Sequence, residues 1–269
     1  MNTEIKLLAF DIDGTLIPRS TTVMEQSTKD IIEKCEQAGI KVLISTGRSS
    51  FFIQKDIVET IKSDYFITAN GGIVTDAKFN TLLKHPISDA NLHRLIELCD
   101  TYNFALGLKF ENAIAVYNRY DYYIDIYVKG VPHDDIIFDY TKTRDYHLSH
   151  GNPVDAFVIG DNDKLQELAS LMPQLDWVVA YDKAVESYNK GVSKASGIEW
   201  VLNQLGLSWD NVMAFGDSEN DIPMIKRAKY GIAMGNAIDS VKAVAKYTTT
   251  NCGDSGIANA INQLLNFDN

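Results

Sequence analysis

Cysteine and positive charge are both scarce in this chain of 269 residues. Its three cysteines, Cys35, Cys99 and Cys252, are scattered along the sequence and form no CxxC pair. An odd number without metal-ligand spacing argues against a disulfide framework and against a zinc site, so a reducing cytoplasm is the expected compartment. Asp and Glu number 36 against 25 Lys and Arg, which gives a formal net charge of −11. This acidity disfavours nucleic acid and anionic membrane surfaces as partners.

Long apolar runs are also missing. The first one stops at Asp11, and no basic segment precedes it. We therefore expect neither a signal peptide nor a membrane-spanning segment. Hydrophobic residues still make up 45% of the chain, which is enough for about two domains at typical domain size.

Short apolar segments alternate with helical patterns at both ends of the chain. In the first part we predict strands at residues 5–10, 40–44 and 65–68, and a helix at 28–38. In the last part we predict helices at 193–205 and 218–228, and strands at 212–215, 231–234 and 247–249. Strands that alternate with helices are typical of a parallel sheet covered by helices on its faces. The predicted fold class is α/β, with a Rossmann-like, doubly wound parallel-sheet core.

The middle of the chain follows a different pattern. We predict helices at 89–102 and 161–172, and strands at 105–108, 113–117, 155–159 and 177–180. None of the loops here carries the polar strand ends seen in the flanking parts. The sequence therefore predicts an α+β domain at residues 83–187, inserted into a core made of residues 1–82 and 188–269, with linkers near 83–86 and 187–189.

Four strand ends of the predicted core carry polar groups that suit a phosphorylated ligand, and Lys194 begins a predicted helix. Ligands of open α/β sheets bind outside the carboxyl ends of the strands, so these groups are expected to lie together. The four strand ends comprise Asp11 with Asp13, residues 46–48, residues 70–72, and residues 216–221.

These residue types match the needs of phosphoryl transfer. The reaction requires an in-line nucleophile, positive charge for the equatorial oxygens and an acid for the leaving group. Asp11 suits the nucleophile because a carboxylate can form an acyl-phosphate, and Asp13 is placed to act as acid and then as base. Lys194 would supply a fixed positive charge. An oxygen-rich Mg²⁺ site is expected from Asp11, the carbonyl of Asp13, Asp217 and Asp221.

Phosphate oxygens are expected to meet Thr46 and the free N–H groups of the turn around it. Arg48 could contact the substrate or fasten its own helix to the core, and the sequence favours neither. The residues predicted to contact the phosphate group or the substrate are Ile12, Thr46, Gly47, Arg48, Asn70, Lys194 and Asn220.

Each of these segments also has a structural interpretation. Residues 70–72 and 216–217 could be turns, and residues 46–48 could cap a helix. Asp217 and Asp221 could favour a helix dipole, and Lys194 could be a solvated side chain. Together these interpretations would require five separate ends to carry phosphate-suited residues by chance, so we favour the site.

With these residues identified, the chain resembles the haloacid dehalogenase superfamily, and within it the Cof-type phosphatases of subfamily IIB, which carry a C2-type cap. The DxDGT motif stands at 11–15, the second motif at Thr46, the third at Lys194 and the GDxxND motif at 216–221. Residues 234–237 are also similar, whereas Ala195 stands where glycine is common. The cap is matched by position and size only.

The resemblance implies an Mg²⁺-dependent phosphatase with an aspartyl-phosphate intermediate, acting on a small phosphorylated metabolite such as a sugar phosphate, as a monomer or small homo-oligomer. Two alternatives stay open: a phosphohexomutase of the same superfamily, and a non-catalytic regulator that binds a phosphorylated ligand. The implied roles are Asp11 as nucleophile, Asp13 as acid and base, Mg²⁺ held by Asp11, Asp13 and Asp217 with Asp221 nearby, and phosphate contacts from Thr46, Lys194 and Asn220.

Two groups in the cap have open interpretations. A run of tyrosines between 117 and 127 could stack on a sugar but is expected to pack in the cap. His147 and His150 could bind a metal but are expected to be surface histidines.

Overall fold

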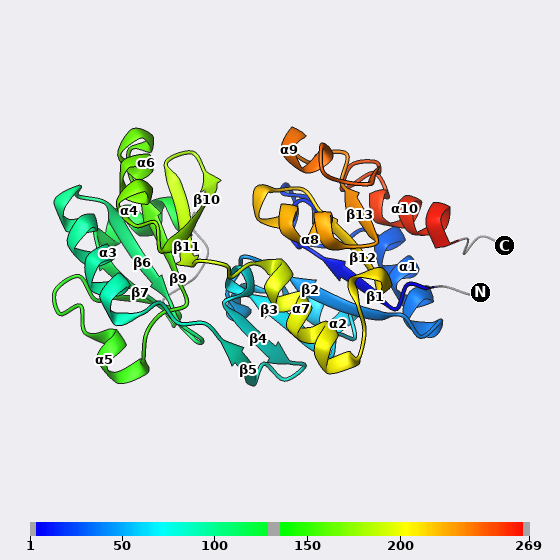
Figure 1. Cartoon of the computed structure of the whole chain (residues 1–269), viewed down its shortest axis with the longest axis horizontal. Coiled ribbons are helices and arrows are strands. Elements are labelled where there is room, and N and C mark those ends of the chain that lie inside the picture. The colour runs from blue at the N-terminus through cyan, green and yellow to red at the C-terminus, as the bar shows by residue number, and fades with distance from the viewer. Residues whose placement is uncertain (1–3, 129–134, 266–269) are drawn as a thin grey trace. The chain divides into compact units, whose positions relative to one another are not determined.

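The computed structural model describes residues 4–128 and 135–265. The chain forms two compact units (Figure 1). The core unit comprises Met1–Arg48, Phe52–Leu82 and Ser193–Asn269, and the inserted unit comprises Ser49–Phe51 and Leu83–Val192. The domain limits predicted from the sequence, with an inserted domain at residues 83–187, stay a prediction.

The core unit contains an eight-stranded sheet in the order β14-β13-β12-β1-β2-β3-β4-β5. The six strands from β14 to β3 are parallel, and β3 pairs with β4 in antiparallel orientation. The strands are β1 (Leu7–Phe10), β2 (Lys41–Ser45), β3 (Tyr65–Thr68), β4 (Ile73–Asp76), β5 (Thr81–Lys84), β12 (Val212–Gly216), β13 (Tyr230–Ala233) and β14 (Tyr247–Thr248).

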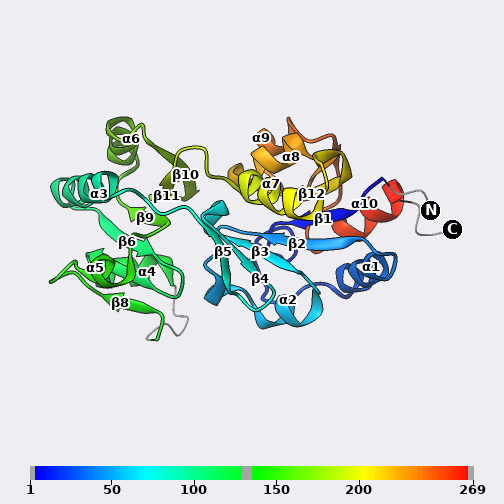
Figure 2. The same cartoon turned by 60° about the horizontal axis from the view of Figure 1, so that its bottom comes forward.

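Helices cover both faces of this sheet (Figure 2). On one face, Ile31 of α1 and Ile261 of α10 join a buried cluster with Leu8 and Phe10 of β1. Helices α7 and α8 cover the other face, where α7 contacts β2 and β3 and α8 contacts β12 and β13. The doubly wound prediction is therefore confirmed. The helices are α1 (Gln26–Gln37), α2 (Lys55–Thr60), α7 (Lys194–Leu205), α8 (Ile222–Arg227), α9 (Asp239–Lys242) and α10 (Gly256–Leu265), with 3-10 turns at Ser50–Phe52, Ala69–Gly71, Trp209–Asn211 and Glu219–Asp221.

The antiparallel addition of β4 was not predicted. The segment after β3 was interpreted as a phosphate-suited strand end or as a turn, and it does turn the chain, because Asn70 and Gly71 both have positive φ. The turn returns the chain alongside β3, so that Thr68 pairs with Ile73. The core sheet is therefore parallel from β14 to β3 and antiparallel where β4 is added.

The inserted unit contains a six-stranded sheet in the order β10-β11-β9-β6-β7-β8. Its strand pairs are antiparallel except β7 with β8. Helices α3 and α6 bury their apolar stripes, including Leu95 and Leu168, against one face of this sheet. The elements are α3 (Asp89–Thr101), β6 (Ala105–Lys109), β7 (Ile114–Asn118), α4 (Tyr120–Tyr127), β8 (Ile137–Asp139), α5 (Tyr146–His150), β9 (Asp155–Ile159), α6 (Asn162–Leu171), β10 (Leu175–Tyr181) and β11 (Ala184–Asn189).

Strand β11 corrects one prediction, since residues 187–189 were expected to be a linker. They complete a strand that pairs with both β10 and β9, and the burial along this strand does not alternate, so a period of two does not identify it. The tyrosines do pack: Tyr117 and Tyr123 are fully buried. Within the described ranges, no helix is long and apolar enough to cross a membrane.

Candidate active site

The order in which the chain adds strands to the core sheet reverses between β1 and β12, and the candidate site lies at that point. From β1 the chain continues outward through β2 and β3, whereas β12 lies on the other side of β1. The register pairs Phe10 with Phe215, and the backbone N–H of Asp11 donates to the carbonyl of Phe215. Asp11 and Asp217 therefore leave neighbouring strands at the carboxyl edge, where open α/β sheets bind ligands.

A tight loop follows Asp11 and needs glycine at position 14. The N–H of Gly14 donates to the carbonyl of Ile17, and the N–H of Ile17 donates to the carbonyl of Ile12. Gly14 has a φ of +86°, and a Cβ there would lie 2.3 Å from Oδ2 of Asp217. A side chain at this position would therefore occupy the space beside the Asp217 carboxylate.

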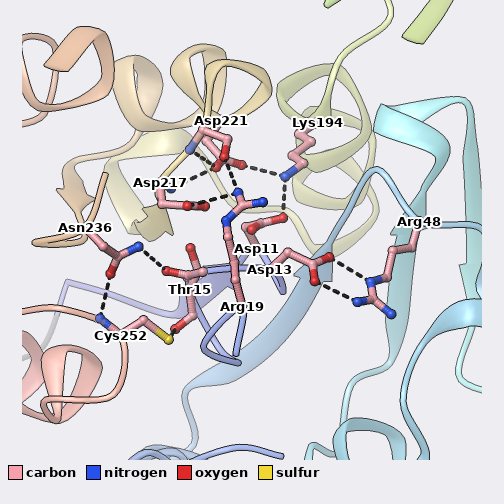
Figure 3. Close-up of polar contacts among 12 residues, drawn as sticks. Asp11, Asp13, Thr15, Arg19, Arg48, Lys194, Asp217, Asp221, Asn236 and Cys252 are labelled. Atoms are coloured by element: carbon pink, nitrogen blue, oxygen red, sulfur yellow. Dashed lines mark hydrogen bonds and ion pairs between the residues drawn. The ribbon is translucent and has the colours of Figure 1, made fainter. Parts of the chain in front are cut away.

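Lys194 reaches the site from the first position of α7, as the sequence predicted for a helix start. Ser193 caps this helix, and its side chain accepts from the N–H of Ser196. The Lys194 ammonium donates to Oδ1 of Asp11 over 2.5 Å and to Oδ1 of Asp221 over 2.6 Å (Figure 3). Burial alone would lower the pKa of Lys194, but the two carboxylates outweigh it and raise that pKa.

Asp221 has a structural task as well as its contact with Lys194. Its Oδ2 accepts from the backbone N–H of Asp217 over 2.9 Å and from that of Ser218 over 3.0 Å. The side chain is completely buried. Asp221 thus fixes the turn after β12 and, through it, the position of Asp217.

Three carboxylates form a group suited to a divalent cation. Oxygen atoms of Asp11, Asp217 and Asp221 all lie within 4.8 Å of one another, the one such group of His, Cys, Asp or Glu side chains in residues 4–128 and 135–265. Oδ1 of Asp217 is buried and accepts no hydrogen bond from the described residues. Hard cations prefer such oxygen ligands, so these residues fit Mg²⁺ or a similar ion. His147 and His150 belong to no such group.

The electrostatics of these carboxylates agree with that interpretation. Burial raises the pKa of Asp11 well above its usual value, and Asp221, Asp217 and Asp13 add to the rise while Lys194 opposes it. Burial and Asp221 also raise the pKa of Asp217. A group of buried acids that resist ionisation is stabilised in its charged form by a bound cation.

Asp13 faces a different partner. Its carboxylate accepts two hydrogen bonds from Arg48, from Nε over 2.7 Å and from the terminal nitrogen over 2.6 Å (Figure 3). Burial would raise the pKa of Asp13, but the hydrogen bonds and charge of Arg48 lower it overall. Arg48 also donates to the carbonyl of Phe52, so it holds both a site carboxylate and its own following turn.

The remaining predicted contacts fall at the same edge of the sheet. Thr46 is buried at the end of β2, and its hydroxyl accepts from the N–H of Arg48, while Gly47 between them is partly buried. The side-chain amide of Asn220 donates to Oδ1 of Asn70 over 2.8 Å, which links the turn after β3 to the turn after β12. The side chain of Ile12 lies in the hydrophobic core, which leaves only its backbone for a phosphate contact.

Two residues of the site, Arg19 and Asn236, were given no role by the sequence interpretation. Arg19 donates to Oδ2 of Asp217 over 3.1 Å and to the hydroxyl of Ser218 over 2.8 Å. Asn236 donates to the carbonyl of Gly14 over 2.9 Å and so braces the loop (Figure 3). Asn236 follows a strand end and could have been found by that signal, whereas no local pattern distinguishes Arg19 from an ordinary surface arginine.

Known proteins resemble this chain over nearly its whole length. The family model for haloacid dehalogenase-like hydrolases matches residues 8–261. The 5-amino-6-(5-phospho-D-ribitylamino)uracil phosphatase YcsE of Bacillus subtilis (strain 168) is 32% identical over 259 residues, which cover 96% of this chain and 95% of that protein. The phosphoglycolate phosphatase of Methanobrevibacter smithii is 26% identical and covers 97% of this chain and 99% of its own length.

Solved structures agree with these relatives. The phosphatase BT1666 of Bacteroides thetaiotaomicron has a TM-score of 0.85 and 26% identity, covering 96% of this chain and 94% of that one. The subclass IIB sugar phosphatase BT4131 has a TM-score of 0.84 and 25% identity, covering 96% and 98%. Both the fold class and the resemblance predicted from the sequence are confirmed. The chain therefore belongs to the haloacid dehalogenase superfamily, in its Cof-type branch, and is a phosphatase.

Proposed function

We propose that this protein is an Mg²⁺-dependent phosphatase that hydrolyses small phosphorylated metabolites, sugar phosphates among them, through a phosphoryl group carried on Asp11. One observation carries the proposal: four side chains converge at the point where the strand order reverses, between β1 and β12. They are Asp11, Asp217, Asp221 and Lys194. The names of the similar phosphatases support a small phosphorylated substrate.

In the first step an oxygen of the Asp11 carboxylate attacks phosphorus, and the bond from phosphorus to the ester oxygen breaks. Asp13 gives its proton to that departing oxygen, so the alcohol leaves neutral. Lys194, held beside Asp11, offsets negative charge on the phosphoryl oxygens.

In the second step Asp13, now ionised, takes a proton from water. The water oxygen bonds to phosphorus, the bond to the Asp11 carboxylate breaks, and inorganic phosphate leaves. Thr46 and the nearby N–H groups would position the phosphoryl oxygens. Mg²⁺, when bound by Asp11, Asp217, Asp221 and the carbonyl of Asp13, would neutralise charge on the phosphoryl group.

The contact between Arg48 and Asp13 bears on the order of these events. By lowering the pKa of Asp13, Arg48 favours the ionised form that the second step needs. The first step requires the protonated form, so we expect this ion pair to loosen when the substrate binds.

The test is release of inorganic phosphate from a panel of phosphorylated metabolites. The panel should include sugar monophosphates, phosphoglycolate and a ribitylaminouracil phosphate, each measured with Mg²⁺ and with EDTA. Wild type and Asp11→Asn are compared, with Asp163→Asn on the exposed surface of α6 as the matched control. We expect release only with Mg²⁺, loss in Asp11→Asn and wild-type rates in Asp163→Asn.

The opposite results would be equally informative. Equal turnover by Asp11→Asn would exclude Asp11 as the nucleophile. Absence of release from every substrate, together with bisphosphate-dependent isomerisation of a sugar phosphate, would replace the hydrolase by a mutase.

A further inference from the structure

Arg19 occupies a position in the site that none of the predicted roles explains. It follows the loop that Gly14 forms, and its guanidinium lies on the carboxylate of Asp217 and the hydroxyl of Ser218 (Figure 3). Because Gly14 has no side chain, nothing separates this loop from the Asp217–Arg19 pair: a Cβ on Gly14 would lie 2.3 Å from Asp217 Oδ2 and 3.2 Å from Arg19 Nε.

The charges of the site explain why Asp217 is paired with the positive charge of Arg19. Lys194 pairs with Asp11 and Asp221, and Arg48 pairs with Asp13. These two cations leave Asp217 to Arg19. Four carboxylates and three cations give a net charge of −1, and adding a divalent cation would change it to +1 if every side chain stayed in place.

Of the two cations that contact the carboxylate group of Asp11, Asp217 and Asp221, Arg19 is the one that can leave easily. Its side chain is 59% exposed, whereas that of Asp217 is 5% exposed. Lys194 is completely buried between two carboxylates, so moving it would leave a buried charge unpaired. The guanidinium of Arg19 can move into water, and the charge that its departure leaves on buried Asp217 is neutralised when a divalent cation takes its place.

The carboxylate of Asp217 also has an oxygen atom that could still bind a ligand. Oδ2 of Asp217 accepts from Arg19, while Oδ1 is buried and accepts nothing from the described residues. An incoming cation would therefore find one oxygen of Asp217 open and meet the positive charge of Arg19 beside the other.

We propose that Arg19 is an exchangeable counter-ion: it neutralises Asp217 when no divalent cation is bound, and it competes with that cation for the same carboxylate. Arg19 is thus a positioning residue that sets the metal affinity of the site. The inference rests on the metal site of the proposed function but not on its phosphatase chemistry.

The experiment measures binding of Mn²⁺ alone to the full chain, with free Mn²⁺ followed by its electron paramagnetic resonance signal at fixed low ionic strength. Arg19→Gln removes the competing charge, and Arg94→Gln, on α3 and paired with Glu97, is the matched control. We expect about tenfold tighter binding by Arg19→Gln, no change in Arg94→Gln, and displacement of Mn²⁺ by Mg²⁺ in all three proteins.

A second readout separates competition from a general change in charge. Without metal, Arg19→Gln should melt at a lower temperature than wild type because Asp217 has lost its partner. Saturating Mn²⁺ should remove that difference. Replacing an arginine that only faces solvent would change neither the Mn²⁺ affinity nor the melting temperature.

Unchanged or weaker Mn²⁺ binding by Arg19→Gln would overturn the inference while leaving the metal site in place. Failure of wild type to bind Mn²⁺, or undiminished binding by Asp217→Asn, would overturn both the site and the inference. If the affinities change as expected but no substrate is hydrolysed, the inference stands and only the proposed catalysis fails.

Discussion

Replacing Lys194 by methionine would remove the one cation that is wholly buried among the site carboxylates. Methionine has a similar length, so the change deletes the charge and leaves the packing nearly intact. The ammonium lies 2.5 Å from Asp11 and 2.6 Å from Asp221, and both contacts are lost together. Breaking a buried ion pair by removing one partner costs about 3–5 kcal/mol. For a unit of this size, that corresponds to about 6–20 °C in melting temperature.

The deficit should depend on pH in a defined direction. The pKa of Asp11 is already raised in the folded protein, chiefly by burial, and Lys194 opposes that rise. Without Lys194 the pKa rises further, so the folded state holds a proton more readily than the unfolded chain. Stability from such a group is present below the unfolded pKa and is lost as pH rises through the folded pKa. The deficit of Lys194→Met should therefore be smaller at pH 5 than at pH 7.

Scanning calorimetry in EDTA at pH 7 and pH 5 would measure both effects, with Lys226→Met on the exposed side of α8 as the control. Mg²⁺ at pH 7 should recover part of the loss, because a divalent cation can replace the missing charge. A drop of less than about 3 °C at pH 7, or a drop of the same size at both pH values, would refute the claim that Lys194 stabilises the folded core by neutralising these carboxylates.

Two further predictions concern the surroundings of the site. Gly71→Ala should destabilise the core by at least about 2 kcal/mol more than Gly39→Ala. Both glycines have positive φ, but only at Gly71 would the new Cβ lie 2.1 Å from the carbonyl oxygen of Ser193. Equal losses of stability in thermal denaturation would contradict this explanation. Arg48→Gln should raise the pKa of Asp13, which Arg48 now lowers, and a carboxyl-carbon NMR titration would show its midpoint moving upward; an unmoved midpoint would mean that Arg48 does not control this group.

The sequence predicted which side chains gather at the candidate site better than it predicted the edges of the sheets. Asp11, Asp217 and Lys194 were found because each stands directly after an apolar strand or at a helix start, and the parallel order brings such ends together. Strands β4 and β11 were missed although the strands they pair with were predicted. Residues 70–72 and 187–189 were interpreted as a turn and a linker, and the strands beside them became evident only from their antiparallel pairing.

The two arginines show a different limit. Arg48 was left equally divided between two roles, and the structure gives it contacts with both Asp13 and the turn at Phe52. Arg19 follows the DxDGT motif but is not part of it, and its role in the site depends on Asp217, which lies 198 positions away along the chain. Contacts of this kind are set by the fold and leave no pattern in the local sequence.

The pairing of β1 with β12 has a consequence for how the chain is made. Leu7 of β1 pairs with Val212 of β12, which the ribosome synthesises much later. One edge of β1 therefore has no partner strand until then. The inserted unit, most of which is one continuous stretch, is synthesised in the meantime. Until β12 emerges, a strand of four buried apolar residues has an unpaired edge, which is the kind of surface that aggregates or recruits chaperones. The arrangement that brings Asp11 beside Asp217 thus also leaves one edge of β1 without its partner until residues 212–215 have been synthesised.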